Sequence, residues 1–290
     1  MSDRSTRFER DTAVTALGQG HFGARIDRSW WIVAGPNGGY VAAVVLRAVV
    51  AAVDDPTRRP RSATFHYLRP PDEGPVEVEV TVERSGRSVT NASARMTQGG
   101  RTTVLALVSL GADRESSVSF DEGAELPVGP DGRTVPLWST LPVADVDPDR
   151  EIPMRANYDM RWALGDRPFR PSDGARARCG GWLRLLEPPV VDEVALVAMA
   201  DAWLPPIFSR VAEMVAVPTV DLTVHFRGRP ADERGWCFVE FTSPVARDGY
   251  VGEHGAIRDE TCRLLADVRQ LAVLVGTPAS VAAGARSAYP

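Results

Sequence analysis

Hydrophobic and polar positions follow a similar order twice along the chain. An apolar, helix-like stretch at residues 35–54 precedes strand-like runs at 62–68, 76–83, 88–96 and 102–110. A second round has strand-like runs at 158–164 and 179–185, a helix at 190–203, and further runs at 219–226, 237–242, 250–258 and 263–274. A buried helix followed by an antiparallel meander predicts an α+β fold in which each of two sheets wraps around a central helix.

The two rounds also share a sequence repeat. Thr64-Phe65-His66-Tyr67 is matched by Thr223-Val224-His225-Phe226. A repeat that occurs only twice indicates two similar fused domains rather than a solenoid. We predict an N-terminal unit at 1–112, a linker at 113–153, a second unit at 154–276 and a flexible tail at 277–290. Polar residues shared by both units, such as the paired histidines, are then architectural, and those confined to one unit are candidates for chemistry.

Composition excludes several classes of protein. The 290 residues carry a net charge of −5, which favours neither nucleic-acid nor membrane binding. No apolar run reaches the length of a membrane span and no signal peptide is recognisable, so we expect a cytoplasmic protein. All 33 basic residues are arginine, which excludes a Schiff-base lysine and a Walker loop. The three cysteines are widely spaced, so we expect them to be reduced and buried, with no metal site and no cofactor.

Two polar residues of the second unit fall on positions expected to be buried. Helical spacing puts Asp201 on one stripe with Val194, Val197 and Ala198. A buried carboxylate is costly unless it is hydrogen-bonded, so it is a candidate for function. The alternative is that Asp201 reaches solvent or caps a turn. Gln270 is the lone polar residue in an alternating apolar row of the last strand, and its first-half counterpart is approximately Ser109. A core glutamine that satisfies irregular backbone is the competing interpretation.

Thr219 is a third candidate. Strict alternation along its strand places it on one face with Asp221, Thr223 and His225. Its counterpart in the first unit is Pro60, so the hydroxyl is not repeated. Threonine is common in strands, and this position alone carries little weight.

The chain resembles the thioesterase II group of acyl-CoA thioesterases over about residues 15–275. Four motifs carry the resemblance: Gly35-Pro36-Asn37-Gly38-Gly39-Tyr40, Ala200-Asp201-Ala202-Trp203, Val217-Pro218-Thr219-Val220-Asp221 and Leu265-Ala266-Asp267-Val268-Arg269-Gln270. The resemblance implies a double hotdog fold and an enzyme of lipid metabolism that hydrolyses acyl-CoA. It also implies that Asp201, Thr219 and Gln270 hold the hydrolytic water.

The resemblance further places the helix start of one hotdog beside the acid of the other. Asn37, Gly38, Gly39 and Tyr40 are therefore expected to bind substrate or the oxyanion. Arg227 and Arg229 could meet the phosphates of coenzyme A, although a solvated surface role competes. A homo-oligomer, dimeric or larger, is also expected from the resemblance.

Two other kinds of function stay open at the level of sequence. The first is a hotdog hydratase, dehydratase or acyl-transfer enzyme of a biosynthetic pathway. The second is a protein that binds acyl-CoA without turnover. The sequence does not fix the length of the acyl chain, the pathway, or whether the thiol is coenzyme A or a carrier protein.

Overall fold

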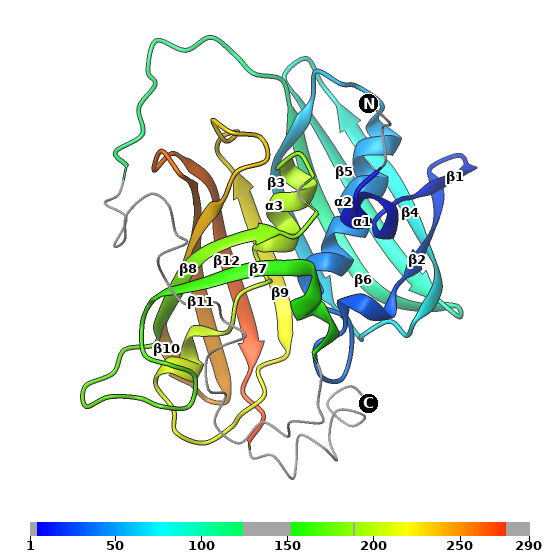
Figure 1. Ribbon diagram of the computed structural model, residues 1–290. Coiled ribbons are helices and arrows are strands. Elements are labelled where there is room, and N and C mark those ends of the chain that lie inside the picture. The colour runs from blue at the N-terminus through cyan, green and yellow to red at the C-terminus, as the bar shows by residue number, and fades with distance from the viewer. Residues whose placement is uncertain (1–4, 124–151, 188, 277–290) are drawn as a thin grey trace.

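The computed structural model describes residues 5–123, 152–187 and 189–276. Within these ranges, 12 strands form one antiparallel sheet in the order β1-β2-β4-β5-β6-β3-β9-β12-β11-β10-β8-β7. The N-terminal half of the sheet and the C-terminal half lie side by side, blue to cyan and green to red in Figure 1. Each half curves around a helix, as the α+β double hotdog predicts.

The first half contains β1 (Thr15–Gly18), β2 (His21–Ile26), β3 (Arg59–Tyr67), β4 (Gly74–Ser85), β5 (Val89–Gln98) and β6 (Arg101–Gly111). The second contains β7 (Tyr158–Leu164), β8 (Arg178–Leu185), β9 (Thr219–Phe226), β10 (Cys237–Arg247), β11 (Tyr250–Asp259) and β12 (Leu264–Val273). The helices are α1 (Arg7–Asp11), α2 (Gly38–Val53) and α3 (Glu193–Met199), with short 3-10 turns η1 (Arg28–Trp30), η3 (Pro153–Asn157) and η4 (Pro206–Ser209). The sequence pattern did not indicate α1, β1 or β2. Most of the proposed linker and all of the proposed tail lie outside the described residues.

The repeated segments meet at the centre of the sheet. Strands β3 and β9 pair antiparallel with Thr64 opposite Thr223, and the two hydroxyl oxygens are 3.0 Å apart. These threonines are the equivalent positions of the repeat, so the two halves are related by an approximate twofold axis through this pair. The pairing of β3 with β9 therefore joins two similar sheets into one continuous sheet.

Helix α2 is the core of the first half. Every residue from Gly39 to Leu46 is buried, because β2 to β6 wrap one side of the helix and α3 packs against it. The N-cap is Asn37, whose Oδ1 accepts from the Tyr40 main-chain N–H at 3.0 Å. An all-apolar helix can form here because it exposes almost no side to water.

Helix α3 is shorter than the predicted 190–203. It begins after the N-cap Asp192, whose Oδ1 accepts from Ala195 N, and it ends at Met199. Asp201 therefore lies in the turn after the helix instead of on the helical stripe. The Pro205-Pro206 pair that follows soon after has no main-chain N–H groups with which to continue the helix.

A β-bulge changes the face on which Thr219 lies. Asp221 pairs with Leu271, but Thr219 pairs with Ala272, so Val220 is an extra residue in β9. The extra residue turns Thr219 to the face of Leu222 and Gln270, away from Asp221, Thr223 and His225. The predicted face was wrong because alternation assumes an unbroken ladder.

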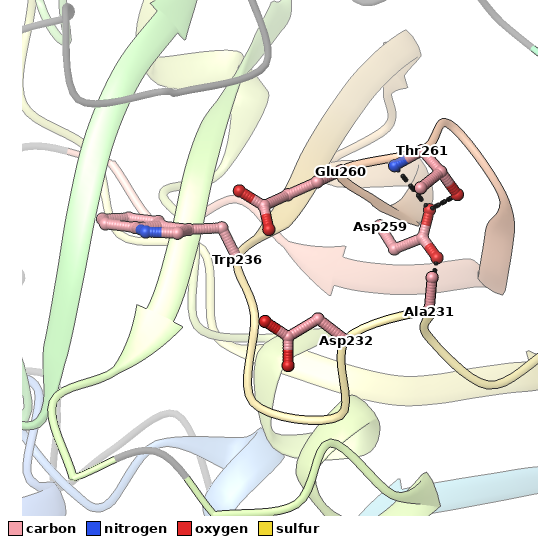
Figure 2. Close-up of a pocket in the computed structure, with 6 residues that line it drawn as sticks. All are labelled: Ala231, Asp232, Trp236, Asp259, Glu260 and Thr261. Atoms are coloured by element: carbon pink, nitrogen blue, oxygen red, sulfur yellow. Dashed lines mark hydrogen bonds between the residues drawn. The ribbon is translucent and has the colours of Figure 1, made fainter.

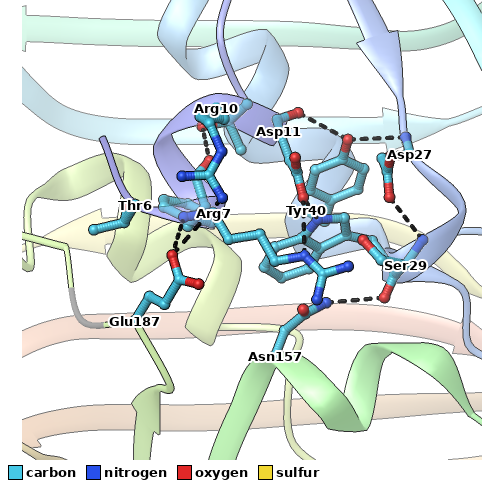
Figure 3. Close-up of polar contacts among 12 residues, drawn as sticks. Thr6, Arg7, Arg10, Asp11, Asp27, Ser29, Tyr40, Asn157 and Glu187 are labelled. Atoms are coloured by element: carbon cyan, nitrogen blue, oxygen red, sulfur yellow. Dashed lines mark hydrogen bonds and ion pairs between the residues drawn. The ribbon is translucent and has the colours of Figure 1, made fainter. Parts of the chain in front are cut away.

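Hydrogen bonds of the N-terminal segment and of η1 connect the two halves, and Figure 3 shows contacts of this region. The main-chain N–H of Arg7 in α1 donates to Glu187 Oε2 at 2.8 Å, and Trp30 Nε1 donates to Asp11 Oδ2 at 2.9 Å. Asn157 Nδ2 donates to the Ser29 carbonyl oxygen at 2.9 Å. These contacts fix the segment that leads into α2.

Candidate active site

The side chain of Asp201 is the centre of a hydrogen-bond network built from both halves. Its Oδ2 accepts from the main-chain N–H of Gly39 and from Asn37 Nδ2, each at 3.0 Å. Asn37 Nδ2 also donates to the main-chain oxygen of Asp201 at 2.7 Å. The turn after α3 is thus held against the start of α2.

Glycine is required at the start of α2 because the two helices approach so closely. A Cβ on Gly39 would lie 2.5 Å from the main-chain oxygen of Ala198 and 3.0 Å from the Cβ of Asp201. A Cβ on Gly38 would lie 2.9 Å from Asp201 Oδ2. The absence of these side chains lets the main-chain amides reach the carboxylate at the positive end of the helix.

Gln270 and Thr219 complete the network from the sheet. Gln270 Nε2 donates to Asp201 Oδ1 at 3.0 Å and also contacts Thr219 Oγ1 in a short hydrogen bond. The two N–H groups of the amide are therefore both in use. The structure brings Asp201, Thr219 and Gln270 together on the inner face of the second half.

Burial raises the pKa of Asp201 to about 6, while the hydrogen bonds from Gly39, Gln270, Gly38 and Asn37 act in the opposite direction. The group is thus ionised at neutral pH and can still accept a proton. Oδ2 accepts from Asn37 and Gly39, Oδ1 accepts from Gln270, and the Gly38 main-chain N–H also acts on the carboxylate. A carboxylate has about four lone-pair sites, and Gln270 uses one of those on Oδ1, so Oδ1 can accept from a further donor.

Other residues singled out in the sequence lie elsewhere or serve other contacts. The Tyr40 ring points away from Asp201: its hydroxyl donates to the Asp11 carbonyl oxygen at 2.9 Å, as Figure 3 shows, and its ring stacks on Trp30. Arg227 pairs at the surface with Asp267, 2.7 Å between Nε and Oδ2. Cys179 and Cys237 are buried as expected, but Cys262 is partly exposed.

Comparison with known proteins identifies the family. Residues 27–111 match the acyl-CoA thioesterase N-terminal domain, and residues 138–274 match the acyl-CoA thioesterase C-terminal domain. The chain belongs to the acyl-CoA thioesterase family. The first match spans β3 to β6 and the second spans β7 to β12, so the two units of the sequence repeat correspond to the two domains of this family.

Similar proteins match this chain over most of its length. A hot dog fold protein of unknown function from Alicyclobacillus acidocaldarius has a TM-score of 0.81 and 25% identity, covering 94% of this chain and 99% of that one. A protein assigned as a thioesterase II from Thermobifida fusca has a TM-score of 0.78 and 26% identity, with coverage of 93% and 98%. An uncharacterised protein of Mycobacterium tuberculosis is 29% identical over 273 residues, 87% of this chain and 90% of that protein.

Apolar residues occupy the first-half positions that are equivalent to Thr219 and Gln270. Ala63 pairs with Val108 in the first half as Leu222 pairs with Gln270 in the second, so Val108 is the counterpart of Gln270, not Ser109. The first half has the same bulge, with Pro60 in the place of Thr219. Pro60 and Val108 can neither position a water nor hold an acid by side-chain hydrogen bonds.

Two residues near the site were missed in the sequence. Tyr67, on β3, donates its hydroxyl to the Gly38 carbonyl oxygen at 2.8 Å and supports the helix start. Glu253, on β11, is buried opposite Gln270. Alternation along β11 carries the signal for this glutamate, since it shares a face with the buried Val251 and Ile257.

A surface cavity of about 220 Å³ lies apart from this network and is lined by Ala231, Asp232, Trp236, Asp259, Glu260 and Thr261. In Figure 2 the Asp259 carboxylate is turned to the loop, where it accepts from Thr261 and from the Ala231 main-chain N–H. The Asp259 carboxylate therefore stabilises the loop. None of the candidate catalytic residues lines the cavity. Among the residues described, no helix has the length and apolar character that crossing a bilayer requires.

Proposed function

We propose that the protein hydrolyses acyl-CoA thioesters to a free acid and coenzyme A, using a water held by Asp201, Thr219 and Gln270. The observation that carries the proposal is the single network joining these three side chains to the start of α2. Family membership supplies the substrate class. The residues supply a base and two positioning groups, which is what hydrolysis of an activated thioester requires.

The reaction proceeds in two balanced stages. Asp201 Oδ1 takes a proton from the water as the water oxygen bonds to the thioester carbonyl carbon. The tetrahedral intermediate then collapses, the carbon–sulfur bond breaks, and the leaving thiolate receives the proton from Asp201. Thr219 accepts from Gln270 and can therefore direct its own hydroxyl hydrogen to the water oxygen.

The start of α2 has a dual part in this proposal. The amide of Gly39 and the side chain of Asn37 serve Asp201 directly, and the Tyr40 main-chain N–H serves Asn37. These donors are already engaged. In this proposal Asn37, Gly38, Gly39 and Tyr40 therefore stabilise the oxyanion through the positive end of the α2 dipole and not by direct hydrogen bonds from free amides. No histidine contacts Asp201 among the described hydrogen bonds, whereas the hotdog hydratases invoked as an alternative pair an Asp with a His.

The test is thiol release from a panel of short- to long-chain acyl-CoAs. We expect hydrolysis by the wild-type protein and a loss of at least ~10²-fold in kcat for Asp201→Asn, the scale of a general base. The matched control is Asp267→Asn, which removes a carboxylate of the exposed Arg227 ion pair and leaves turnover unchanged.

Three outcomes contradict the proposal in different ways. Near-normal turnover by Asp201→Asn removes this residue from the mechanism. Acyl-CoA binding without release of thiol indicates a binding protein. A change at the α,β carbons of the acyl group indicates a hydratase or dehydratase.

A further inference from the structure

Polar residues from three neighbouring strands form a row behind the catalytic network. Glu253 of β11 lies directly opposite Gln270 of β12 in the ladder. Ser243 lies in a bulge of β10 that faces Glu253, between the pairs Thr242–His254 and Val245–Gly252. Both Glu253 and Ser243 are buried, with 6% and 8% of their surface exposed. The side chains of paired residues on one face lie about 5 Å apart at Cβ, so Glu253 and Gln270 are neighbours.

The first half of the sheet has no such row. Val108 and Ala92 pair there as Gln270 and Glu253 pair in the second half. Both first-half residues are apolar and buried. The buried carboxyl of Glu253 is thus confined to the half that contains the catalytic network, which is the distribution expected of a residue that serves the site.

The surroundings of Glu253 keep its carboxyl neutral. Two ionisable groups on neighbouring elements interact electrostatically with Glu253: Asp201, in the turn after α3, and Cys179, on β8. Gln270 and Ser243, which face Glu253 from β12 and β10, are uncharged. No ion pair within the described ranges involves Glu253. Burial and then the charge of Asp201 raise the pKa of Glu253 to about 8. At neutral pH the group is therefore an acid with a proton to donate.

The Gln270 amide needs a partner that fixes its orientation. Its nitrogen donates to both Asp201 and Thr219, and the reversed orientation would place its carbonyl oxygen against the carboxylate. An amide and its reversed form have nearly the same shape, so hydrogen bonding decides between them. We propose that Glu253 is a positioning residue, which in its neutral form donates to the Gln270 carbonyl oxygen and holds the amide nitrogen toward Asp201 and Thr219.

The activity experiment, which rests on the proposed function, compares two replacements. Glu253→Gln keeps a donor but cannot ionise, and Glu253→Leu keeps the approximate size without a donor. We expect wild-type kcat to fall above about pH 8, Glu253→Gln to stay flat to about pH 9.5, and Glu253→Leu to lose about tenfold to a hundredfold at every pH. The control is Glu79→Gln, at an exposed position of β4, which should keep the wild-type profile.

A second readout does not depend on turnover. The chain has three glutamines, Gln19, Gln98 and Gln270, so a protein with ¹⁵N in its glutamine side chains gives three amide signals. We expect the Gln270 signal to shift near pH 8 in the wild-type protein and to stay constant in Glu253→Gln. An invariant wild-type signal overturns the proposal, as does wild-type kcat in Glu253→Leu. Absence of thiol release by the wild-type protein counts against the proposed function alone.

Discussion

At the scale of single residues, the environment of Asp201 sets the protonation of its carboxyl group. The carboxylate is desolvated by its position between α2 and the sheet, yet several donors stabilise its charge. A base with a pKa near the working pH can take a proton from water and release it to the leaving thiolate. The same carboxylate in water would be a much weaker base.

The first prediction at this scale concerns the acid side of the pH profile. In the proposed mechanism Asp201 acts in its ionised form, and its pKa is about 6, so kcat/KM should fall as the pH drops through about 6. Asn37→Ser removes the Nδ2 donor but keeps a side chain able to cap α2. The loss of a donor to the charged form raises the pKa of Asp201, so the acid limb should move to higher pH. A limb that stays in place or moves to lower pH contradicts this role of Asn37.

Most candidate residues were predictable from the chain, but not their geometry. Asp201 and Gln270 stand out because each interrupts an apolar pattern. Thr219 stood out only because its hydroxyl has no counterpart in the first half, and its face was assigned wrongly because nothing in the alternation marks Val220 as the bulged residue. Glu253 could have been found by counting in twos along β11, since it lies in a row of buried residues.

At the scale of elements, the decisive feature is the close approach of the α2 start to the turn after α3. Gly39 makes this approach possible because even a methyl group there would collide with main-chain atoms of Val197 and Ala198. Main-chain atoms cannot rotate away as a long side chain does, so the helices would have to separate.

Gly39→Ala should therefore lower both stability and activity. We expect a cost of about 1–3 kcal/mol in the free energy of unfolding, typical of overpacking, together with a lower kcat because the Gly39 amide withdraws from Asp201. Denaturant titration and thiol release measure the two effects. The matched control is Gly252→Ala on β11, where an added Cβ meets nothing within 4 Å. A Gly39→Ala protein as stable and active as the control contradicts the packing argument.

At the scale of the whole molecule, two similar halves form one sheet and together build the candidate site. One hydrophobic cluster contains residues of both halves, and the hydrogen-bond network around Asp201 takes its carboxylate from the second half and its helix start from the first. The repeat in the sequence predicted the two halves. The pairing of β3 with β9 could not be deduced from it, because edge-to-edge joining depends on tertiary contacts between distant segments.

The asymmetry of the molecule follows from a few positions. Pro60, Ala92 and Val108 occupy in the first half the places of Thr219, Glu253 and Gln270 in the second. The first half keeps the bulge and the helix, so it contributes structure and the positive end of α2. One half thus supports the site and the other carries its side chains.

The most direct test of water activation by Asp201 is a single turnover of acyl-CoA by excess protein in H₂¹⁸O. Direct attack by the held water predicts that the released acid carries one ¹⁸O atom, that Asp201 carries none, and that no acyl-protein is detected by mass. An unlabelled acid from the first turnover, with ¹⁸O in the peptide that contains Asp201, would mean that the carboxylate itself attacks the thioester and would contradict the account.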